Sequence, residues 1–298
     1  MTTFDTLPAR YRSLVARTTA VTIPEHEILA TVVVVLYRTD RAAFETTLAA
    51  LDAQTADAFD VIVVDNGTTW DVPAVLAGSR RVRTYVELTG NHGVTVARNL
   101  GAHLAAGPLL VFLDDDAVPD PHFVEEHLRV HRVSNVIAAR GRVVPRTDTI
   151  YNKMQSHYDL GPAQFPTYIN VEGNTSFDRD TFRSLGGYDE SFEGRAGHEG
   201  IEWTYRALEA GIPASKIVYY PDAVVAHDYA DGFWVYVNKK RYFRRYQAAL
   251  REDYPHLFAF TSEYEANRPG VPGRLGFTDR LKIRLIESLA APLSALRR

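Results

Sequence analysis

Three consecutive carboxylates, Asp114, Asp115 and Asp116, follow directly after the apolar run LLVFL at residues 109–113. A strand buried on both faces of a parallel sheet reads as such a run, and ligands of open α/β sheets bind at the carboxyl ends of strands. Because adjacent like charges repel one another, a divalent cation such as Mg²⁺ or Mn²⁺, which prefers oxygen ligands, is the simplest compensation. The pattern predicts a site for a metal-bound phosphate ester. A solvated acidic turn, closed by VPDP at residues 118–121, is the alternative interpretation.

Other polar side chains in the chain have both a chemical and a structural interpretation. Asp65 ends a second apolar run and either binds a ligand or forms the turn that Asp-Asn-Gly favours. Arg98 lies on an alanine-rich helix and is either a ligand-binding cation or a surface one. His227 follows the apolar run AVVA and is either a metal ligand or a buried core histidine. Glu202 stands four residues before Arg206, and we expect this pair to be structural.

A sheet must bring these side chains together, and the first part of the chain predicts one. Apolar, β-branched runs of strand length occur at residues 31–36, 61–64 and 82–88, in addition to the run at 109–113. Segments with helical spacing separate them. Strands that alternate with helices imply a parallel sheet with right-handed crossovers, so we predict an α/β fold whose nucleotide-binding half is Rossmann-like and covers residues 31–120.

The pattern after this half changes to mixed α+β. We expect helices at residues 122–132 and 199–210, and strands within 135–144 and at 216–220. Residues 145–169 are rich in Pro, Tyr and Gln without a clean period, which predicts an irregular excursion that could serve as a substrate loop.

The last part of the chain, residues 231–298, predicts a C-terminal helical extension. A long helix at 233–251 places cations four residues apart, and their repulsion requires an anion or water. The cation pairs are Lys240 with Arg244 and Arg241 with Arg245. A final basic helix carries Leu281, Leu285 and Leu289 on one side, so it could lie on a membrane surface or dock on the domain.

Composition limits the classes of function. The 298 residues are 46% hydrophobic, which suffices for a sizeable core, and the net charge of -4 gives no general attraction to nucleic acid. Without cysteine there is no disulfide, thiolate metal site or cysteine nucleophile. Neither a leader segment nor an apolar run near the ~20 residues of a membrane span is found, so we expect a cytoplasmic protein, with peripheral contact at the inner membrane face through the basic C-terminal helices. Residues 1–30 have weak periodicity, and we expect an irregular arm or short helices outside the core.

Taken in order, the motifs of residues 31–230 resemble those of family-2 glycosyltransferases of the GT-A fold. The segments that carry the resemblance are VVVVLYRTDR, VIVVDNGT, GVTVARNLGAHLAAG, LLVFLDDDAVPDP with its Asp-x-Asp metal motif, GNTSFDRDTFRSLGGYDESF and GHEGIEWTYRALEAG. The resemblance implies a GT-A domain at residues 31–230, with the nucleotide-binding half at 31–120 and an acceptor half at 121–230.

The resemblance also implies roles for individual residues. The nucleotide would be bound by Tyr37, Asp65, Arg98, Asp114 and Asp115. The ligands of Mg²⁺ or Mn²⁺ would be Asp114, Asp116 and His227. The acceptor would be bound by Asn174 and His198, and the catalytic base would be Glu199.

Two departures from the family pattern bear on these roles. The usual Pro-Thr-Tyr-Asn of the first loop is Val-Leu-Tyr-Arg here, and the usual Glu-Asp pair of the catalytic helix is Glu199-Gly200. Since the family acid is absent at position 200, we expect the neighbouring Glu199 to act as base, with Asp189 and Glu193 as alternatives.

The implied activity is metal-dependent transfer of a sugar from a nucleoside-diphosphate sugar to an acceptor hydroxyl, with inversion. A catalytically inactive nucleotide-sugar binding or scaffold protein is the alternative that Gly200 favours. A sugar-1-phosphate nucleotidyltransferase is a further alternative, but its glycine-rich loop should follow the first strand, and YRTDR at residues 37–41 contains no glycine.

Overall fold

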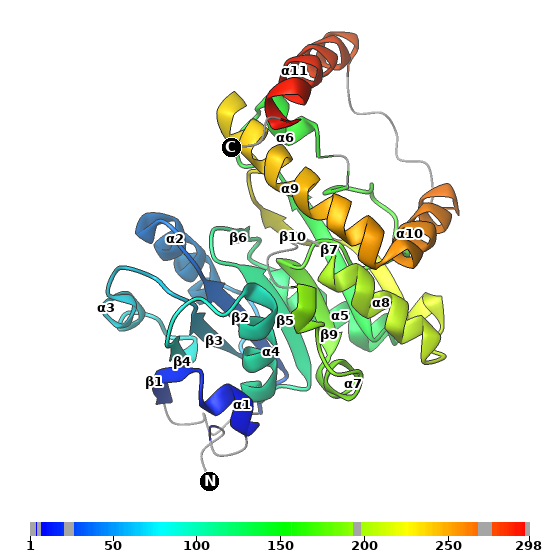
Figure 1. Ribbon diagram of the computed structural model, residues 1–298. Coiled ribbons are helices and arrows are strands. Elements are labelled where there is room, and N and C mark those ends of the chain that lie inside the picture. The colour runs from blue at the N-terminus through cyan, green and yellow to red at the C-terminus, as the bar shows by residue number, and fades with distance from the viewer. Residues whose placement is uncertain are drawn as a thin grey trace.

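One mixed sheet forms the centre of the computed structural model, which describes residues 4, 7–20, 27–155, 157–192, 198–267 and 276–295 (Figure 1). In these residues the ten-stranded sheet has the order β1-β4-β3-β2-β5-β9-β7-β10-β6, and β8 pairs with β10. The strands are β1 Val15–Ala20, β2 Ala30–Leu36, β3 Phe59–Asp65, β4 Val82–Leu88, β5 Leu109–Asp114, β6 Val118–Pro119, β7 Ala138–Val144, β8 Phe165–Pro166, β9 Asn174–Asp178 and β10 Ile217–Ala226.

The helices cover both faces of this sheet. In the first part of the chain they are α1 Ala9–Arg12, α2 Arg41–Asp52, α3 Val72–Leu76, α4 Val94–Leu104 and α5 Phe123–Ser134. The later ones are α6 Ile150–Lys153, α7 Arg179–Ser184, α8 Glu199–Glu209, α9 Phe233–Asp253, α10 Pro255–Asn267 and α11 Phe277–Ala295.

The predicted parallel half is confirmed. Strands β4, β3, β2 and β5 are parallel neighbours, and β3 is buried along its whole length. Alternate residues of β2 face opposite layers: Val33 packs in the cluster that contains α4, while Val32 and Val34 pack in the cluster that contains α2. This two-sided burial explains why the strands read as continuous apolar runs. It also places the carboxyl ends of β2 and β5 side by side.

The N-terminal arm differs from the prediction, because its described residues belong to the core and to the sheet. Strand β1 pairs antiparallel with β4, and Leu7 and Tyr11 are buried in the same cluster as α4. The sequence of β1, VARTTA, is polar because it is an edge strand, and so it lacks the apolar pattern that reveals a central strand. The arm closes the edge that β4 would otherwise expose.

Strand β9 was also not predicted, and it joins the two halves of the sheet. It runs antiparallel to both β5 and β7, so the parallel order ends at β5. Its residues Asn174, Thr175 and Ser176 are fully buried although they are polar, and therefore they give no hydrophobic signal. The predicted strands within 135–144 and at 216–220 correspond to β7 and β10.

The C-terminal helical extension lies beside α6 and α8 (Figure 1). Helix α10 contributes Leu257 to a cluster with Ile201 of α8, and α11 contributes Ala290 to a cluster with Val237 of α9. Among the helices in the described ranges, none combines the length and the apolar content that crossing a bilayer requires.

Candidate active site

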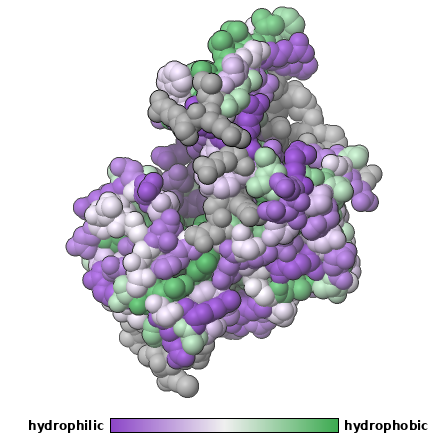
Figure 2. Space-filling view, viewed as in Figure 1, coloured by the Kyte–Doolittle hydropathy of each residue, from purple (hydrophilic) through white to green (hydrophobic). Residues whose placement is uncertain are grey.

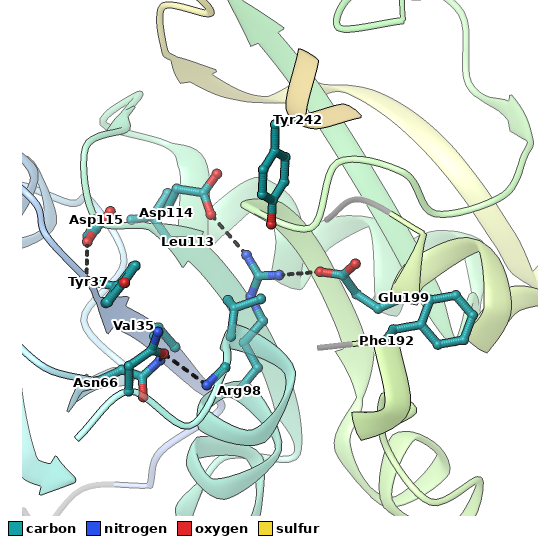
Figure 3. Close-up of a pocket in the computed structure, with 13 residues that line it drawn as sticks. Val35, Tyr37, Asn66, Arg98, Leu113, Asp114, Asp115, Phe192, Glu199 and Tyr242 are labelled. Atoms are coloured by element: carbon teal, nitrogen blue, oxygen red, sulfur yellow. Dashed lines mark hydrogen bonds and ion pairs between the residues drawn. The ribbon is translucent and has the colours of Figure 1, made fainter. Parts of the chain in front are cut away.

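A cavity of about 460 Å³ opens at the carboxyl ends of β2 and β5, where the sequence predicts a site. Helix α4 lies on one side of the cavity, and helices α8 and α9 lie on the other (Figure 3). The lining residues are Val35, Tyr37, Asn66, Asn91, Gly93, Val94, Arg98, Leu113, Asp114, Asp115, Phe192, Glu199 and Tyr242. Its volume is suited to a small-molecule ligand.

The three carboxylates at the end of β5 each have a separate partner. Asp114 Oδ1 accepts a hydrogen bond from Arg98 Nη2 at 3.0 Å. Asp115 Oδ2 accepts hydrogen bonds from the backbone N–H of Tyr37 and from the hydroxyl of Thr39. Neighbouring groups of the chain therefore offset part of the repulsion within the cluster.

The pKa values of two of these acids move in opposite directions. Burial, together with the charges of Asp116 and Asp114, raises the pKa of Asp115 to about 7. Burial also acts to raise the pKa of Asp116, but the hydrogen bond and the charge of His227 outweigh it and hold this pKa below its ordinary value. Lys239 of α9, which the sequence interpretation did not include, adds a positive potential at Asp116. Asp116 is thus the more strongly ionised of the two.

Of the three metal ligands predicted from the resemblance, Asp114 lines the cavity, whereas Asp116 and His227 are absent from its lining. His227 Nε2 lies 3.2 Å from Asp116 Oδ1, which brings two of the three predicted ligands together. The third, Asp114, faces Arg98. Within the described parts of the chain, no three His, Asp or Glu side chains are grouped as a metal ion requires. The donor set of two carboxylates and an imidazole nevertheless fits Mn²⁺ or Mg²⁺ in kind.

Arg98 connects the two sides of the cavity. Its Nη1 lies 3.1 Å from Glu199 Oε1 on α8, while its Nη2 bonds Asp114 on β5 (Figure 3). Both Arg98 and Glu199 are buried, and a buried charge requires such a partner. The surface interpretation of Arg98 is therefore wrong. The predicted base, Glu199, lies on the cavity wall. Of the two alternative bases, Asp189 accepts a hydrogen bond from the backbone N–H of Ser191. Glu193 lies outside the described residues.

A buried carboxylate that the sequence interpretation missed occupies the space beside Gly200. Glu172 Oε1 accepts a hydrogen bond from the backbone N–H of Gly200 at 3.2 Å. A Cβ atom at position 200 would lie only 2.8 Å from this oxygen and 2.7 Å from Ile169 Cγ2, so these two side chains fill the space that the usual acid would need. Burial and the charge of Glu199 raise the pKa of Glu172 to about 7.

Asp65 forms a turn instead of lining the cavity. Its Oδ1 accepts hydrogen bonds from the backbone N–H groups of Gly67 and Thr68, and its Oδ2 accepts one from the hydroxyl of Tyr85 at 3.0 Å. The structural interpretation of the Asp-Asn-Gly sequence explains these contacts. The next residue, Asn66, lines the cavity in its place.

The two residues predicted to bind the acceptor have other surroundings. Asn174 is fully buried; its Nδ2 donates to the carbonyl oxygens of Arg142 and Ala223, and its Oδ1 lies 3.1 Å from His127 Nε2. It thus ties β9 to β7 and β10, and it is absent from the cavity wall. His198 precedes α8, and its ring lies 6.1 Å from the ring of Phe243.

The other structural expectations for this region are met. Glu202 forms a paired hydrogen bond with Arg206, as predicted for a structural pair. Tyr37 lines the cavity with a partly exposed ring. Phe192 and Tyr242 also line it, and neither was predicted, because they come from segments whose position relative to the sheet depends on tertiary packing.

Comparison with known proteins identifies a family model that matches this chain. The model described as glycosyl transferase family 2 matches residues 31–187. The chain is 30% identical over 230 residues to a validoxylamine A glucosyltransferase of Streptomyces hygroscopicus subsp. limoneus, covering 63% of this chain and 49% of that protein. It is 26% identical over 191 residues to a glucosyl-dolichyl phosphate glucuronosyltransferase of Haloferax volcanii, covering 57% and 59% respectively. The chain thus spans about half the length of these relatives.

A solved structure supports the fold over nearly the whole chain. The mannosyltransferase PcManGT from Pyrobaculum calidifontis, solved in complex with GDP-Man and Mn²⁺, superposes with a TM-score of 0.58 at 19% identity. The match covers 97% of this chain and 81% of that structure. The predicted GT-A fold is thereby confirmed.

Proposed function

This chain belongs to glycosyl transferase family 2, and from that premise we propose that it transfers a sugar from a nucleoside-diphosphate sugar to an acceptor hydroxyl in the cavity beside β5. The observation that carries the proposal is the Arg98 guanidinium, which pairs with Asp114 on one wall and Glu199 on the other. A guanidinium is suited to bind a diphosphate, and the Glu199 carboxylate beside it is suited to accept a proton. Arg98 therefore lies where the two groups of the reaction would meet.

The donor would occupy the side of the cavity formed by β2, β3 and β5. The exposed ring of Tyr37 offers a stacking surface for a base, and the Asn66 amide offers a donor and an acceptor for the edge of a base or a ribose. The diphosphate would lie near Arg98, whose planar guanidinium suits phosphate oxygens. Asp65 stabilises the turn that presents Asn66.

Asp114, Asp116 and His227 would hold Mg²⁺ or Mn²⁺. The Asp116–His227 pair supports this assignment, because both side chains already lie 3.2 Å apart at the end of the sheet. A divalent cation at this place would supply neutralisation of the charge on the leaving diphosphate.

The acceptor hydroxyl would enter from the side of α8 and α9, between Glu199 and Tyr242. In an inverting transfer, its oxygen forms the new bond to the anomeric carbon as its proton passes to the Glu199 carboxylate. The anomeric carbon–oxygen bond to the diphosphate breaks, and its electron pair leaves with the diphosphate. The ion pair with Arg98 holds Glu199 in position for this role.

A sugar-nucleotide binding protein without turnover is the second candidate, because Glu172 and Ile169 exclude a family acid from position 200. Incubation with a panel of nucleotide sugars and each metal separates the two: release of nucleoside diphosphate supports the enzyme, whereas binding without release supports the second candidate.

The test of the metal assignment is the Asp116→Asn variant. It removes the charge that pairs with His227, and we expect turnover to fall about a hundredfold or more with a preserved fold. EDTA should abolish wild-type turnover, and added Mn²⁺ or Mg²⁺ should restore it. Asp222→Asn, at an exposed position of β10, is the matched control and should keep full turnover. Full activity of Asp116→Asn, or of the wild type in EDTA, would contradict the assignment.

A further inference from the structure

Helix α11 presents an apolar stripe that no described part of the chain covers. Its members are Phe277, Leu281, Leu285 and Leu289, which are 81%, 60%, 62% and 53% exposed. Because they are spaced four residues apart, they lie along one face of the helix. Figure 2 shows hydrophobic side chains gathered over this helix at the top of the view. Monomeric proteins rarely expose such a contiguous row without a partner for it.

The orientation of this stripe is set by the way α11 docks on α9. The opposite face of α11 buries Ala290 and Ser294, and Ala290 packs with Tyr236 and Val237 of α9. Arg241 Nη2 donates to the carbonyl oxygen of Leu293, so a cation of α9 binds the carboxyl end of α11. Cations are favourable at that end of a helix. The stripe therefore faces outward.

This docking changes the interpretation of the cations on α9. Besides Arg241, Arg244 Nη1 donates to the carbonyl oxygen of Ala291 and to Ser294 Oγ, each at 3.0 Å. Lys240 lies 3.7 Å from Glu287 of α11. The sequence predicts an anion or water beside these cations; in the structure Lys240 faces a carboxylate of α11, and the two arginines bind oxygen atoms at its carboxyl end. The side chain of Arg245 lies outside the described residues.

The charges on α11 are divided between its two faces. Of its two acids, Asp279 lies 3.5 Å from Lys153 and Glu287 faces Lys240, so both are turned toward cations of the domain. The three cations beside the stripe, Arg280, Lys282 and Arg284, are exposed. On a helical projection the two arginines lie along one border of the stripe, and Lys282 lies along the other. The outward face is apolar along its centre and positive along both borders.

From this arrangement we infer that α11 lies flat on an anionic membrane surface, with the stripe in the acyl–headgroup boundary and the cations at lipid phosphates. A helix of this pattern binds in the plane of the interface, where apolar burial and attraction to anionic lipids act together. Its 19 residues span about 28 Å. A second copy of the chain is a poorer occupant, because a two-fold contact along the stripe would bring each cation near the same cations of the other copy.

The inference extends beyond sugar transfer, and its test does not require turnover. The full chain is mixed with vesicles of phosphatidylcholine alone or of equal parts phosphatidylcholine and phosphatidylglycerol, and the bound fraction is measured by co-sedimentation. We expect binding to the anionic vesicles only, falling steeply as salt increases because surface charges are screened. A wild-type chain that does not bind anionic vesicles at low salt overturns the inference.

Two sets of variants separate the stripe from its borders. Leu281→Asn with Leu285→Asn should weaken vesicle binding at least tenfold, and Val133→Asn, at an exposed apolar position on α5, should leave it unchanged. Since the double variant could loosen α11, Lys282→Glu with Arg284→Glu provides a second measurement on an intact stripe and should cause a similar loss. Arg132→Glu on α5 is its control. Full binding by both variants, or a stripe-dependent dimer with no vesicle binding, contradicts the inference.

Discussion

At the scale of single residues, Arg98 determines the arrangement of the cavity. Its guanidinium bridges Asp114 and Glu199 at 3.0 and 3.1 Å, and burying such a charge is costly unless both sides of it are paired. Because Nη2 contacts Asp114 and Nη1 contacts Glu199, the guanidinium fixes the two carboxylates relative to each other on opposite walls of the cavity.

The residue-scale prediction concerns Glu199. The Glu199→Gln variant cannot take the proton from the acceptor hydroxyl, so we expect the rate of the chemical step to fall about a hundredfold or more. The dissociation constant of the donor should change by less than about threefold. Single-turnover kinetics and donor titration measure the two quantities. Glu209→Gln, exposed on the same helix, should behave as wild type.

The stereochemical outcome of the same reaction provides an independent check. NMR of the first-formed product should show an inverted anomeric centre. A retained centre would end the assignment of Glu199 as the base, and inversion by an active Glu199→Gln variant would transfer the role to Asp189 or Glu193.

Residues at strand ends were predictable from sequence, whereas residues brought in by packing were not. Tyr37, Asp114 and Asp115 follow apolar runs, and they line the cavity because the carboxyl ends of parallel strands meet. Glu172 carried no signal, because its importance comes from its contact with the backbone of Gly200. Asp65 had the right place in sequence, but its own turn uses its carboxylate.

At the scale of elements, the contact of α5 with β9 shows why one central strand was missed. The polar face of β9 is buried against two histidines of α5: His127 Nδ1 and His131 Nε2 each lie 2.8 Å from Ser176 Oγ. A strand with polar side chains can therefore be central in a sheet when side chains of another element form hydrogen bonds with them. The partners are 45 and 49 residues apart in sequence, so no local pattern reveals them.

This contact predicts sensitivity to acid. Burial lowers the pKa of His127 to about 3 and that of His131 to about 4, below the ordinary value near 6.5. Between these values the unfolded chain binds protons that the folded chain does not, so stability falls as the pH falls. Each histidine should contribute about 1.4 kcal/mol per pH unit to this slope. Urea unfolding at a series of pH values measures it.

The His127→Gln variant isolates one of these contributions. Glutamine keeps a polar group near Asn174 but cannot take up a proton. Between pH 6 and pH 4, the slope of the unfolding free energy against pH should therefore decrease by the amount that corresponds to about one bound proton. His256→Gln, at an exposed position of α10, is the control and should keep the wild-type slope. An unchanged slope for His127→Gln would show that other groups govern acid unfolding.

At the scale of the whole molecule, residues from two parts of the chain line the cavity: the part that the family model matches and the part that follows it. The family match ends at residue 187, while Phe192, Glu199 and Tyr242 line the cavity from beyond it. The strand and helix order of the first half was predictable, because short local connections determine it. The placement of α9, α10 and α11 was not, because an amphipathic helix shows which face is buried but not what covers it.

Tyr242 tests whether the C-terminal extension takes part in the reaction. It reaches the cavity from α9, above Arg98 and between Asp114 and Glu199 (Figure 3), on the side that we assign to the acceptor. We expect Tyr242→Ala to raise the KM for the acceptor about tenfold, because an aromatic wall of its site is lost, and to leave the donor dissociation constant within about twofold. Val235→Ala, at an exposed position of the same helix, should change neither value. If Tyr242→Ala instead weakens donor binding at an unchanged acceptor KM, then α9 covers the donor, and the two sides of the cavity must be exchanged in the proposed reaction.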